Sequence, residues 1–146
     1  GVIICAKNKQ ALGFLQKQFQ DRKVHKKYIA KVVGNVNPAH AIIKMPLERN
    51  PSKPQTFRVH TNGKEAETEY KVISSNERYS LVELLPKTGR THQLRVHLAH
   101  LKHPIVGDTL YGGMAADRMY LHAVSLELTI PGGIRKIFTI KPPFHL

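Results

Sequence analysis

The stretch that most constrains this chain is TGRTHQLRVHL at residues 88–98, continued by HPIVGD at 103–108 and YGG at 111–113. It opens with a glycine and an arginine. It then predicts a helix from about residue 91 to residue 101, whose leucines are spaced to form one buried stripe. No acidic residue occurs between positions 84 and 107, although lysines, arginines and four histidines do. A basic, glycine-containing loop that leads into a helix is well suited to binding a polyanion.

The flanking sequence predicts a strand-rich α+β domain over residues 1–146, with a mixed, largely antiparallel sheet and two main helices. Asn8 is a candidate N-cap for the first helix, which we expect to reach about Gln20 with Leu12, Leu15 and Phe19 on one face. The expected strands are a buried one at 2–6, then 27–33 with 40–44 as its candidate partner, 79–85, and two hairpins, 56–60 with 65–73 and 124–130 with 134–140. The first hairpin is predicted from the Asn-Gly pair at 62–63.

The net charge of the chain favours some classes of function over others. The 146 residues carry 23 Lys and Arg against 10 Asp and Glu, a net charge of +13, which is typical of proteins that bind nucleic acid. A membrane-surface protein would need an exposed amphipathic helix with large apolar anchors, and no apolar stretch is long enough to span a bilayer. The single cysteine, Cys5, allows no internal disulfide, which fits a reducing, cytoplasmic setting. Its apolar neighbours predict a buried thiol.

Several side chains are candidates for binding or chemistry. Arg95 lies one helical turn after His92, away from the leucine stripe, and can pair with a carboxylate or a phosphate. Arg90, at the helix start, can contact phosphate together with free backbone N–H groups. Tyr28 combines an aromatic ring with neighbouring lysines, which suits stacking on a base. A solvated surface arginine and a half-buried strand tyrosine are the structural alternatives.

Other candidates are weaker. The histidines at 92, 97, 100 and 103 have no cysteine or nearby carboxylate to complete a metal site. Glu65, Glu67 and Glu69 alternate along a strand and are expected to be its solvent face. Asp108 precedes a Tyr-Gly-Gly turn, so a turn role is favoured over catalysis.

Taken together, these segments resemble the RluA-type RNA pseudouridine synthase family. The run 88–98 with HPIVGD and YG matches the family's C-terminal signature, and KYIAKVVG at 27–34 is similar to its tyrosine segment. Gly63, Lys64, Ala66, Thr68 and Tyr70 match the strand between them. The likeness covers essentially the whole chain.

The resemblance implies an RNA uridine isomerase that needs no cofactor and flips the uridine out of its stack. An aspartate nucleophile acts, the glycosidic bond breaks, and the base reattaches through carbon. In this scheme Tyr28 contacts the target base and Arg95 pairs with the catalytic aspartate. RNA contacts fall to Arg90, His92, Lys87 and Lys27. Ribosomal RNA of the large subunit is the expected substrate and transfer RNA the second, whereas DNA is not expected, and the oligomeric state is left open.

One feature departs from the family. Its aspartate belongs to a His-Arg-Leu-Asp segment followed by Thr-Ser-Gly, and Gly1 corresponds to the last residue of that motif. The only aspartates here are Asp21, Asp108 and Asp117, none of which has the motif around it. We therefore expect the C-terminal portion of a catalytic domain, inactive alone. The alternatives are an RNA-binding module that has lost the nucleophile and a basic ribosome-associated structural protein.

Overall fold

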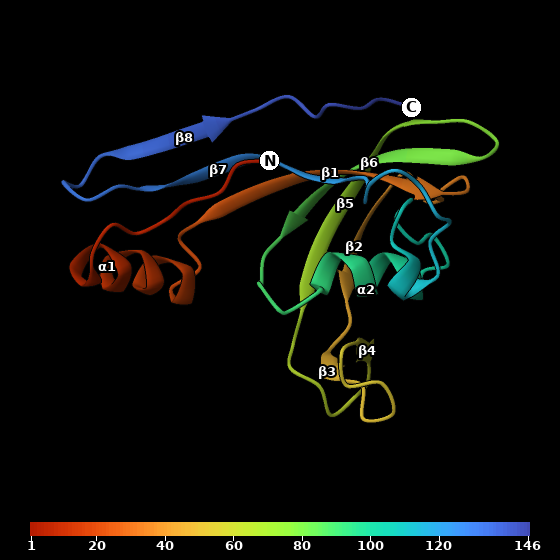
Figure 1. The fold of residues 1–146 in the computed structure, drawn as a ribbon, viewed down its shortest axis with the longest axis horizontal. Coiled ribbons are helices and arrows are strands. Elements are labelled where there is room, and N and C mark those ends of the chain that lie inside the picture. Colours follow the sequence, from red (N-terminus) through yellow and green to blue (C-terminus); the bar gives the residue numbers. More distant parts are fainter.

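The computed structural model describes all 146 residues. It contains helices α1 (Lys9–Gln20) and α2 (Gln93–His100), the short 3-10 helix η1 (Thr109–Tyr111), and the strands β1 (His25–Val33), β2 (His40–Lys44), β3 (Leu47–Arg49), β4 (Phe57–Val59), β5 (Glu67–Ser75), β6 (Tyr79–Pro86), β7 (Leu121–Thr129) and β8 (Arg135–Thr139). Both α-helices lie on the same side of the main sheet, and the β3–β4 hairpin projects beyond that sheet (Figure 1).

The main sheet has six strands in the order β2-β5-β6-β1-β7-β8, and β3 with β4 forms a separate two-stranded sheet. Every pairing is antiparallel. The predicted α+β class with a largely antiparallel sheet and two helices is therefore confirmed. Strand β1 is central: Tyr28 lies opposite Leu84 of β6 on one side and Ala123 of β7 on the other.

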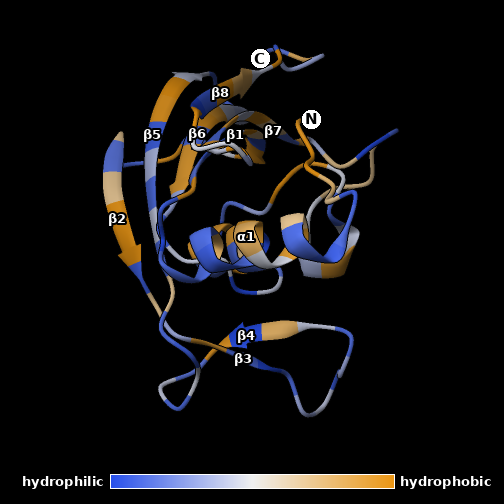
Figure 2. Ribbon diagram, turned by 90° about the vertical axis from the view of Figure 1, so that its left-hand side faces the viewer, coloured by the Kyte–Doolittle hydropathy of each residue, from blue (hydrophilic) through white to orange (hydrophobic).

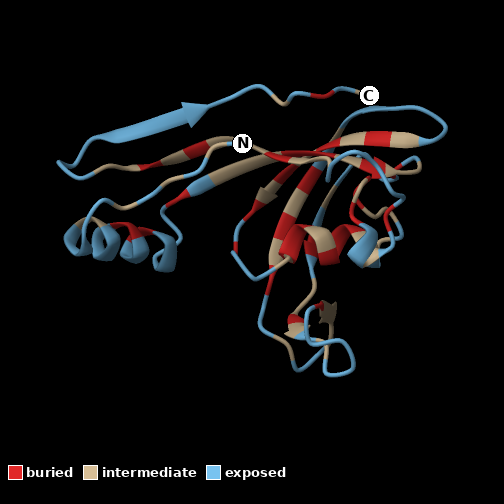
Figure 3. Cartoon of the chain, in the orientation of Figure 1, coloured by how far each residue is buried: buried red, intermediate tan, exposed pale blue.

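The principal core lies between α2 and the central strands, where the buried segments concentrate (Figure 3). Its ten buried members are Ala30, Val32, Val36, Ile43, Tyr70, Val82, Leu84, Leu94, Leu98 and Ile105. A second cluster under α1 joins Leu15 and Val24 to β7, and a third attaches the β3–β4 hairpin through Leu47 to Val96 of α2. Burial of these apolar side chains therefore holds both helices and the hairpin to one sheet.

Helix α1 begins as predicted, with the Asn8 side chain accepting a hydrogen bond from the Ala11 N–H at 2.8 Å. Its apolar face is only partly as expected, because Leu15 is buried whereas Leu12 and Phe19 are 46% and 41% exposed (Figure 2 shows the mixed polarity of this helix). The buried position in the last turn belongs to Gln18, which bonds both the N–H and the C=O of Thr129. The N–H and C=O of Thr129 need hydrogen-bond partners, so an amide side chain is more favourable at this buried position than an apolar one.

The predicted buried strand at residues 2–6 is wrong. That segment joins no ladder, and Val2 donates one hydrogen bond to the Ala123 carbonyl at 2.8 Å. Alternate residues Val2, Ile4 and Ala6 pack against the cluster under α1, so the residues between them face outward. Cys5 is accordingly exposed and not buried as expected.

Two predicted pairings are also wrong. Strand β4 pairs with β3 rather than forming a hairpin with β5, and β2 pairs with β5 rather than with β1. The Asn-Gly turn instead brings Gly63 against the backbone of Leu47, where a Cβ atom would lie 2.5 Å from the Leu47 carbonyl carbon. Glycine here permits a close backbone approach, which redirects the chain away from a two-strand hairpin.

Strand β3 was not predicted, whereas the remaining predicted elements are present. The β7–β8 hairpin forms, and α2 buries Leu94 and Leu98 as expected. Helix α2 starts at Gln93, two residues later than predicted, because His92 is left-handed with φ of 56°. Neither helix is long and apolar enough to cross a membrane.

Candidate RNA-binding site

The loop between β6 and α2 is shaped by the side chain of Gln93, which is 4% exposed. Its carbonyl oxygen accepts from the Thr88 hydroxyl at 2.7 Å and from the Arg90 N–H at 3.0 Å. Its amide donates to the Glu67 carbonyl and to the Thr68 hydroxyl, both at 2.9 Å. All four hydrogen-bonding capacities of this amide are used. Gln93 therefore ties the loop that carries Arg90 to strand β5.

The network continues to His97, which is fully buried. Its Nε2 donates to the Met45 carbonyl at 2.9 Å, so its Nδ1 accepts from the Thr68 hydroxyl at 3.0 Å. Burial lowers the pKa of His97 and keeps it neutral, the state in which this pair of bonds is possible. With both nitrogens occupied, His97 has no lone pair for a metal ion, and no group of three or more potential metal ligands occurs in the chain.

Arg95 forms a bidentate ion pair with Asp108. Its Nε and Nη2 donate to the two carboxylate oxygens at 2.7 and 2.8 Å, and its guanidinium lies 4.8 Å from the centroid of the Tyr111 ring. The Arg95 side chain is 17% exposed and that of Asp108 1%. The hydrogen bond to Asp108 raises the pKa of Arg95 further, so the guanidinium is permanently charged.

This pair corrects one expectation, the turn role of the Asp108 side chain. Asp108 makes no side-chain capping bond in its turn; its carboxylate holds Arg95 instead. Gly107 enables this placement, because it has φ of +83° and a Cβ atom there would collide with the Arg118 carbonyl. The sequence made Arg95 a candidate partner for a carboxylate or a phosphate, and the carboxylate that it binds within this chain is that of Asp108.

His92 is held by Tyr111, whose hydroxyl accepts from the Phe57 N–H at 2.9 Å and lies 2.7 Å from the His92 Nδ1. Burial and then the positive charge of Arg95 lower the pKa of His92. The ring is therefore neutral at pH 7. We assign the hydrogen of the Tyr111 hydroxyl to Nδ1, which leaves the proton of His92 on Nε2.

These groups border a pocket of about 410 Å³ beside the α2 N-terminus, lined by Tyr28, Arg90, His92 and Arg95 together with Lys26 and apolar side chains. Burial raises the pKa of Tyr28, so its phenol stays protonated. The Tyr28 hydroxyl makes no hydrogen bond within the chain. The pocket has an aromatic ring and three cations but no carboxylate in its lining, a composition that suits a planar base attached to phosphate.

The predicted site residues do not all meet here. Lys87 lines the two adjoining cavities instead. Lys27 forms an ion pair with Glu83 at 2.9 Å and, by the alternation of a strand, faces away from Tyr28. Lys26 takes the place beside Tyr28 and was missed. The sequence could have identified Lys26, since residues two apart on a strand share a face.

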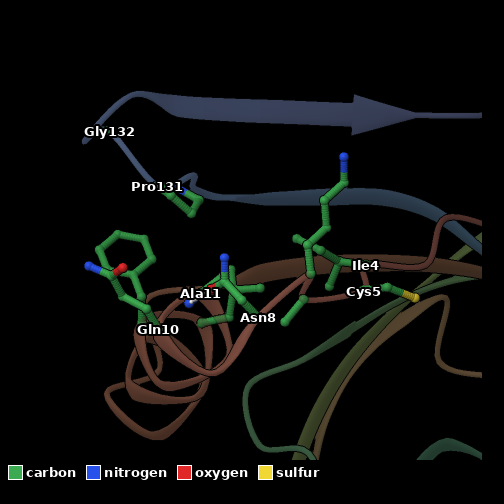
Figure 4. A pocket seen from close by; sticks show the side chains of 11 residues that line it. Ile4, Cys5, Asn8, Gln10, Ala11, Pro131 and Gly132 are labelled. Carbon is green, nitrogen blue, oxygen red and sulfur yellow. Dashed lines mark hydrogen bonds between the residues drawn. The ribbon is translucent and has the colours of Figure 1, made fainter.

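Another cavity, of about 540 Å³, lies between the N-terminal segment, α1 and the β7–β8 turn. Figure 4 shows the side chains of Ile4, Cys5, Asn8 and Ala11 around it, with Pro131 across the opening. Most of its lining is apolar and none of the predicted site residues borders it. This cavity is therefore separate from the site beside α2.

None of the three aspartates lines the pocket that holds Tyr28. Asp21 caps the C-terminal end of α1, and Asp117 accepts from the Tyr120 hydroxyl at 2.9 Å. Asp108 lies behind Arg95, engaged through both oxygens. The 146 residues therefore present no carboxylate to a molecule bound in this pocket.

Comparison with known proteins identifies the family and supports the fold. The family model described as RNA pseudouridylate synthase matches residues 1–100. The chain is 43% identical over 135 residues to the ribosomal large subunit pseudouridine synthase D of Borreliella burgdorferi, covering 89% of this chain and 41% of that protein. It is 40% identical over 137 residues to the dual-specificity RNA pseudouridine synthase RluA of Escherichia coli, covering 90% of this chain and 63% of that protein.

The solved structure of human RNA pseudouridylate synthase domain containing 1 superposes with a TM-score of 0.86 at 32% identity, covering 96% of this chain and 63% of that one. The chain thus spans between about two fifths and two thirds of the length of these relatives. Sequence, fold and family model agree, and the chain belongs to the RNA pseudouridylate synthase family.

Proposed function

We propose that this chain forms part of an enzyme that converts uridine to pseudouridine in RNA, with large-subunit ribosomal RNA as its first candidate substrate and transfer RNA as its second. The observation that carries the proposal is the pocket beside α2, which brings Tyr28 of β1 together with Arg90 and Arg95. A relative with 43% identity carries the large ribosomal subunit in its name, and that name supports the order of the two substrates.

The pocket suits a nucleotide that has left its stack. Its volume, about 410 Å³, lies within the range of pockets that enclose small ligands. The ring of Tyr28 offers a face for the base, and its free, protonated hydroxyl offers a donor to a base carbonyl. Arg90 and His92 at the rim can bond the flanking ribose and phosphate. Lys87 of the loop and Lys26 of β1 extend the positive charge beside Arg90.

The net reaction breaks the bond between ribose C1′ and base N1 and forms one between C1′ and base C5; the proton at C5 leaves and N1 gains one. We propose that the nucleophile is an aspartate outside these 146 residues, because the pocket has no carboxylate of its own. Arg95 can still receive it: Nε and Nη2 are bonded to Asp108, whereas Nη1 makes no hydrogen bond within the chain. Asp108 would then act as the group that orients Arg95.

The test uses ribosomal RNA that lacks the modification. This chain is compared with a version extended upstream through a His-Arg-Leu-Asp segment, and pseudouridine is quantified by chromatography of the released nucleosides. Activity in the extended form alone is the expected result. The matched control is the extended form with its aspartate replaced by asparagine, which should bind RNA but leave uridine unchanged.

Two results would contradict the proposal. RNA binding without turnover in either form would favour a binding module that has lost its nucleophile. Binding that does not weaken with salt would argue against RNA as the ligand, since phosphate contacts release counterions and make affinity steeply salt-dependent.

A further inference from the structure

A second cavity, of about 420 Å³, adjoins the Tyr28 pocket and is lined by Arg22, Lys26, Lys87 and Arg90 with no acidic residue. The two cavities share Lys26, Arg90 and the loop residues Thr88 and Gly89. Phe19, which is 41% exposed, stands at the edge of the second cavity. The loop that Gln93 holds in shape thus lies between the pocket that contains Tyr28 and a cavity whose charged lining residues are all cations.

The four cations of this cavity have no carboxylate partner. Elsewhere in the chain Lys27 pairs with Glu83 and Arg135 with Glu127, but none of the four forms an ion pair. Lys26 makes its closest polar contact with the Thr88 carbonyl at 3.4 Å, and burial lowers its pKa. The guanidinium of Arg90 donates only through Nε, to the Glu65 carbonyl. Unpaired cations that converge on one cavity repel one another unless an anion joins them.

Arg22 occupies a backbone position that disfavours arginine. The end of α1 is a Schellman motif, in which Lys23 N–H bonds the Gln18 carbonyl and Arg22 N–H bonds the Phe19 carbonyl. Arg22 is the left-handed residue of this motif, with φ of 56°. Glycine is preferred there because a side chain costs about 1 kcal/mol or more. Local strain of this kind is typical of functional positions, and here it places a guanidinium on the cationic cavity.

We propose that the cavity bordered by Arg22, Lys26, Lys87 and Arg90 binds a backbone phosphate of the RNA next to the nucleotide held by Tyr28. The inference rests on the proposed function for the identity of the ligand as RNA. Its physical basis is the shared wall: a base in one pocket and its neighbouring phosphate in the other are joined by one ribose. The site adds to the predicted contacts two cations, Arg22 and Lys26, that lie far from the 88–98 stretch in sequence.

The chain contains its own matched control. Lys102 is also left-handed, with φ of 68°, and ends α2 with the same pair of bonds, from His103 N–H to the Leu98 carbonyl and from Lys102 N–H to the Ala99 carbonyl. It lines neither cavity. Arg22→Gly and Lys102→Gly therefore remove one positive charge each from the same backbone position and relieve the same strain. Neither variant should melt at a lower temperature than the parent chain.

The first measurement is the affinity for a short oligouridylate as a function of salt. Arg22→Gly should reduce the slope of log affinity against log salt by about one and weaken binding about fivefold to eightfold near 0.1 M salt. Lys102→Gly should change either quantity much less. Replacing one phosphate of the oligouridylate with a neutral methylphosphonate should weaken binding to the parent chain but not weaken Arg22→Gly further. Equal losses for the two glycine variants, or additive losses with the methylphosphonate, would overturn the site.

A second measurement does not depend on RNA recognition. Titration of the chain with pyrophosphate, followed by amide chemical shifts, should move the resonances of Gly89 and Lys26, and Arg22→Gly should reduce that response. If these resonances do not move, the site is refuted. If pyrophosphate binds there while oligouridylate does not bind the chain, the anion site stands and the proposed RNA function fails instead.

Discussion

Replacing Asp108 with leucine should strongly destabilise the chain, because it leaves the Arg95 guanidinium without its carboxylate. The bidentate pair has donor–acceptor distances of 2.7 and 2.8 Å, and only 17% of the Arg95 side chain is exposed. Removing one partner of a buried ion pair costs about 3–5 kcal/mol. Since Arg95 also borders the pocket and can reach water there, we expect the lower end of that range, about 3 kcal/mol. For comparison, the total free energy of unfolding of a small domain is roughly 5–15 kcal/mol.

The assay is urea denaturation at neutral pH, followed by circular dichroism, on a four-member cycle. Asp108→Leu and Arg95→Met are the single variants and their combination is the double variant. Arg95→Met should lose at least as much stability as Asp108→Leu, because the carboxylate it leaves behind is only 1% exposed. The double variant should lose much less than the sum, since replacing both charges with apolar groups is often close to neutral.

Two outcomes would show that Arg95 and Asp108 do not form a buried ion pair. Losses under about 1 kcal/mol that also shrink in high salt would describe a solvated surface pair. Additive losses in the double variant would mean that Arg95 and Asp108 do not interact in solution.

Three further predictions concern the same site. Gln93→Leu should destabilise the chain by about 3–4 kcal/mol, at roughly 1 kcal/mol for each of four hydrogen bonds, and should speed hydrogen exchange at the Arg90 N–H; an unchanged exchange rate would refute its role in the loop. Burial lowers the pKa of His97 in the folded chain, so the unfolded chain binds a proton at a higher pH than the folded chain does. The free energy of unfolding should therefore be constant above about pH 7 and fall as the pH drops through about 6.5. The His97→Gln variant should lose less stability over this range, and an equal loss would exclude His97 as its source. Tyr28→Phe, which removes a hydroxyl without a partner in the chain, should change stability by less than about 0.5 kcal/mol while lowering turnover of the extended form at least roughly tenfold; normal turnover would limit Tyr28 to stacking.

Much of the local structure follows from short-range patterns. The Asn8 cap, the stripe of α2, the alternation of Ala66, Thr68 and Tyr70, and the β7–β8 hairpin all appear as expected. Each depends on residues at most a few positions apart, where helical and strand periodicity act directly. The net positive charge and the 88–98 stretch likewise predicted that the ligand is a polyanion, and the family resemblance narrowed this ligand to RNA.

The errors share one cause, which is that a strand pattern does not say which strand lies beside it. The Asn-Gly pair predicted a hairpin of β4 with β5, but packing of Leu47 against Ala66 and Val96 drew β4 to β3 instead. Residues 2–6 have the composition of a strand, yet β7 has β1 and β8 on its two edges and offers them a single hydrogen bond. Which segment pairs with a given strand edge therefore depends on all the strands of the sheet and not on the segment's own sequence.

By itself the sequence predicted most of the elements and their order, a strongly positive net charge and, through its resemblance to the family, a site that includes Tyr28, Arg90 and Arg95. Only the tertiary structure decided that Arg95 pairs with Asp108, that Lys26 rather than Lys27 stands beside Tyr28, and that Arg22 reaches the same loop from the end of α1. The physical reason is the distance along the sequence over which each interaction acts. Periodicity and capping act over a few residues, whereas a charge in a partly buried site is stabilised by whichever groups the folded chain brings within a few ångströms of it.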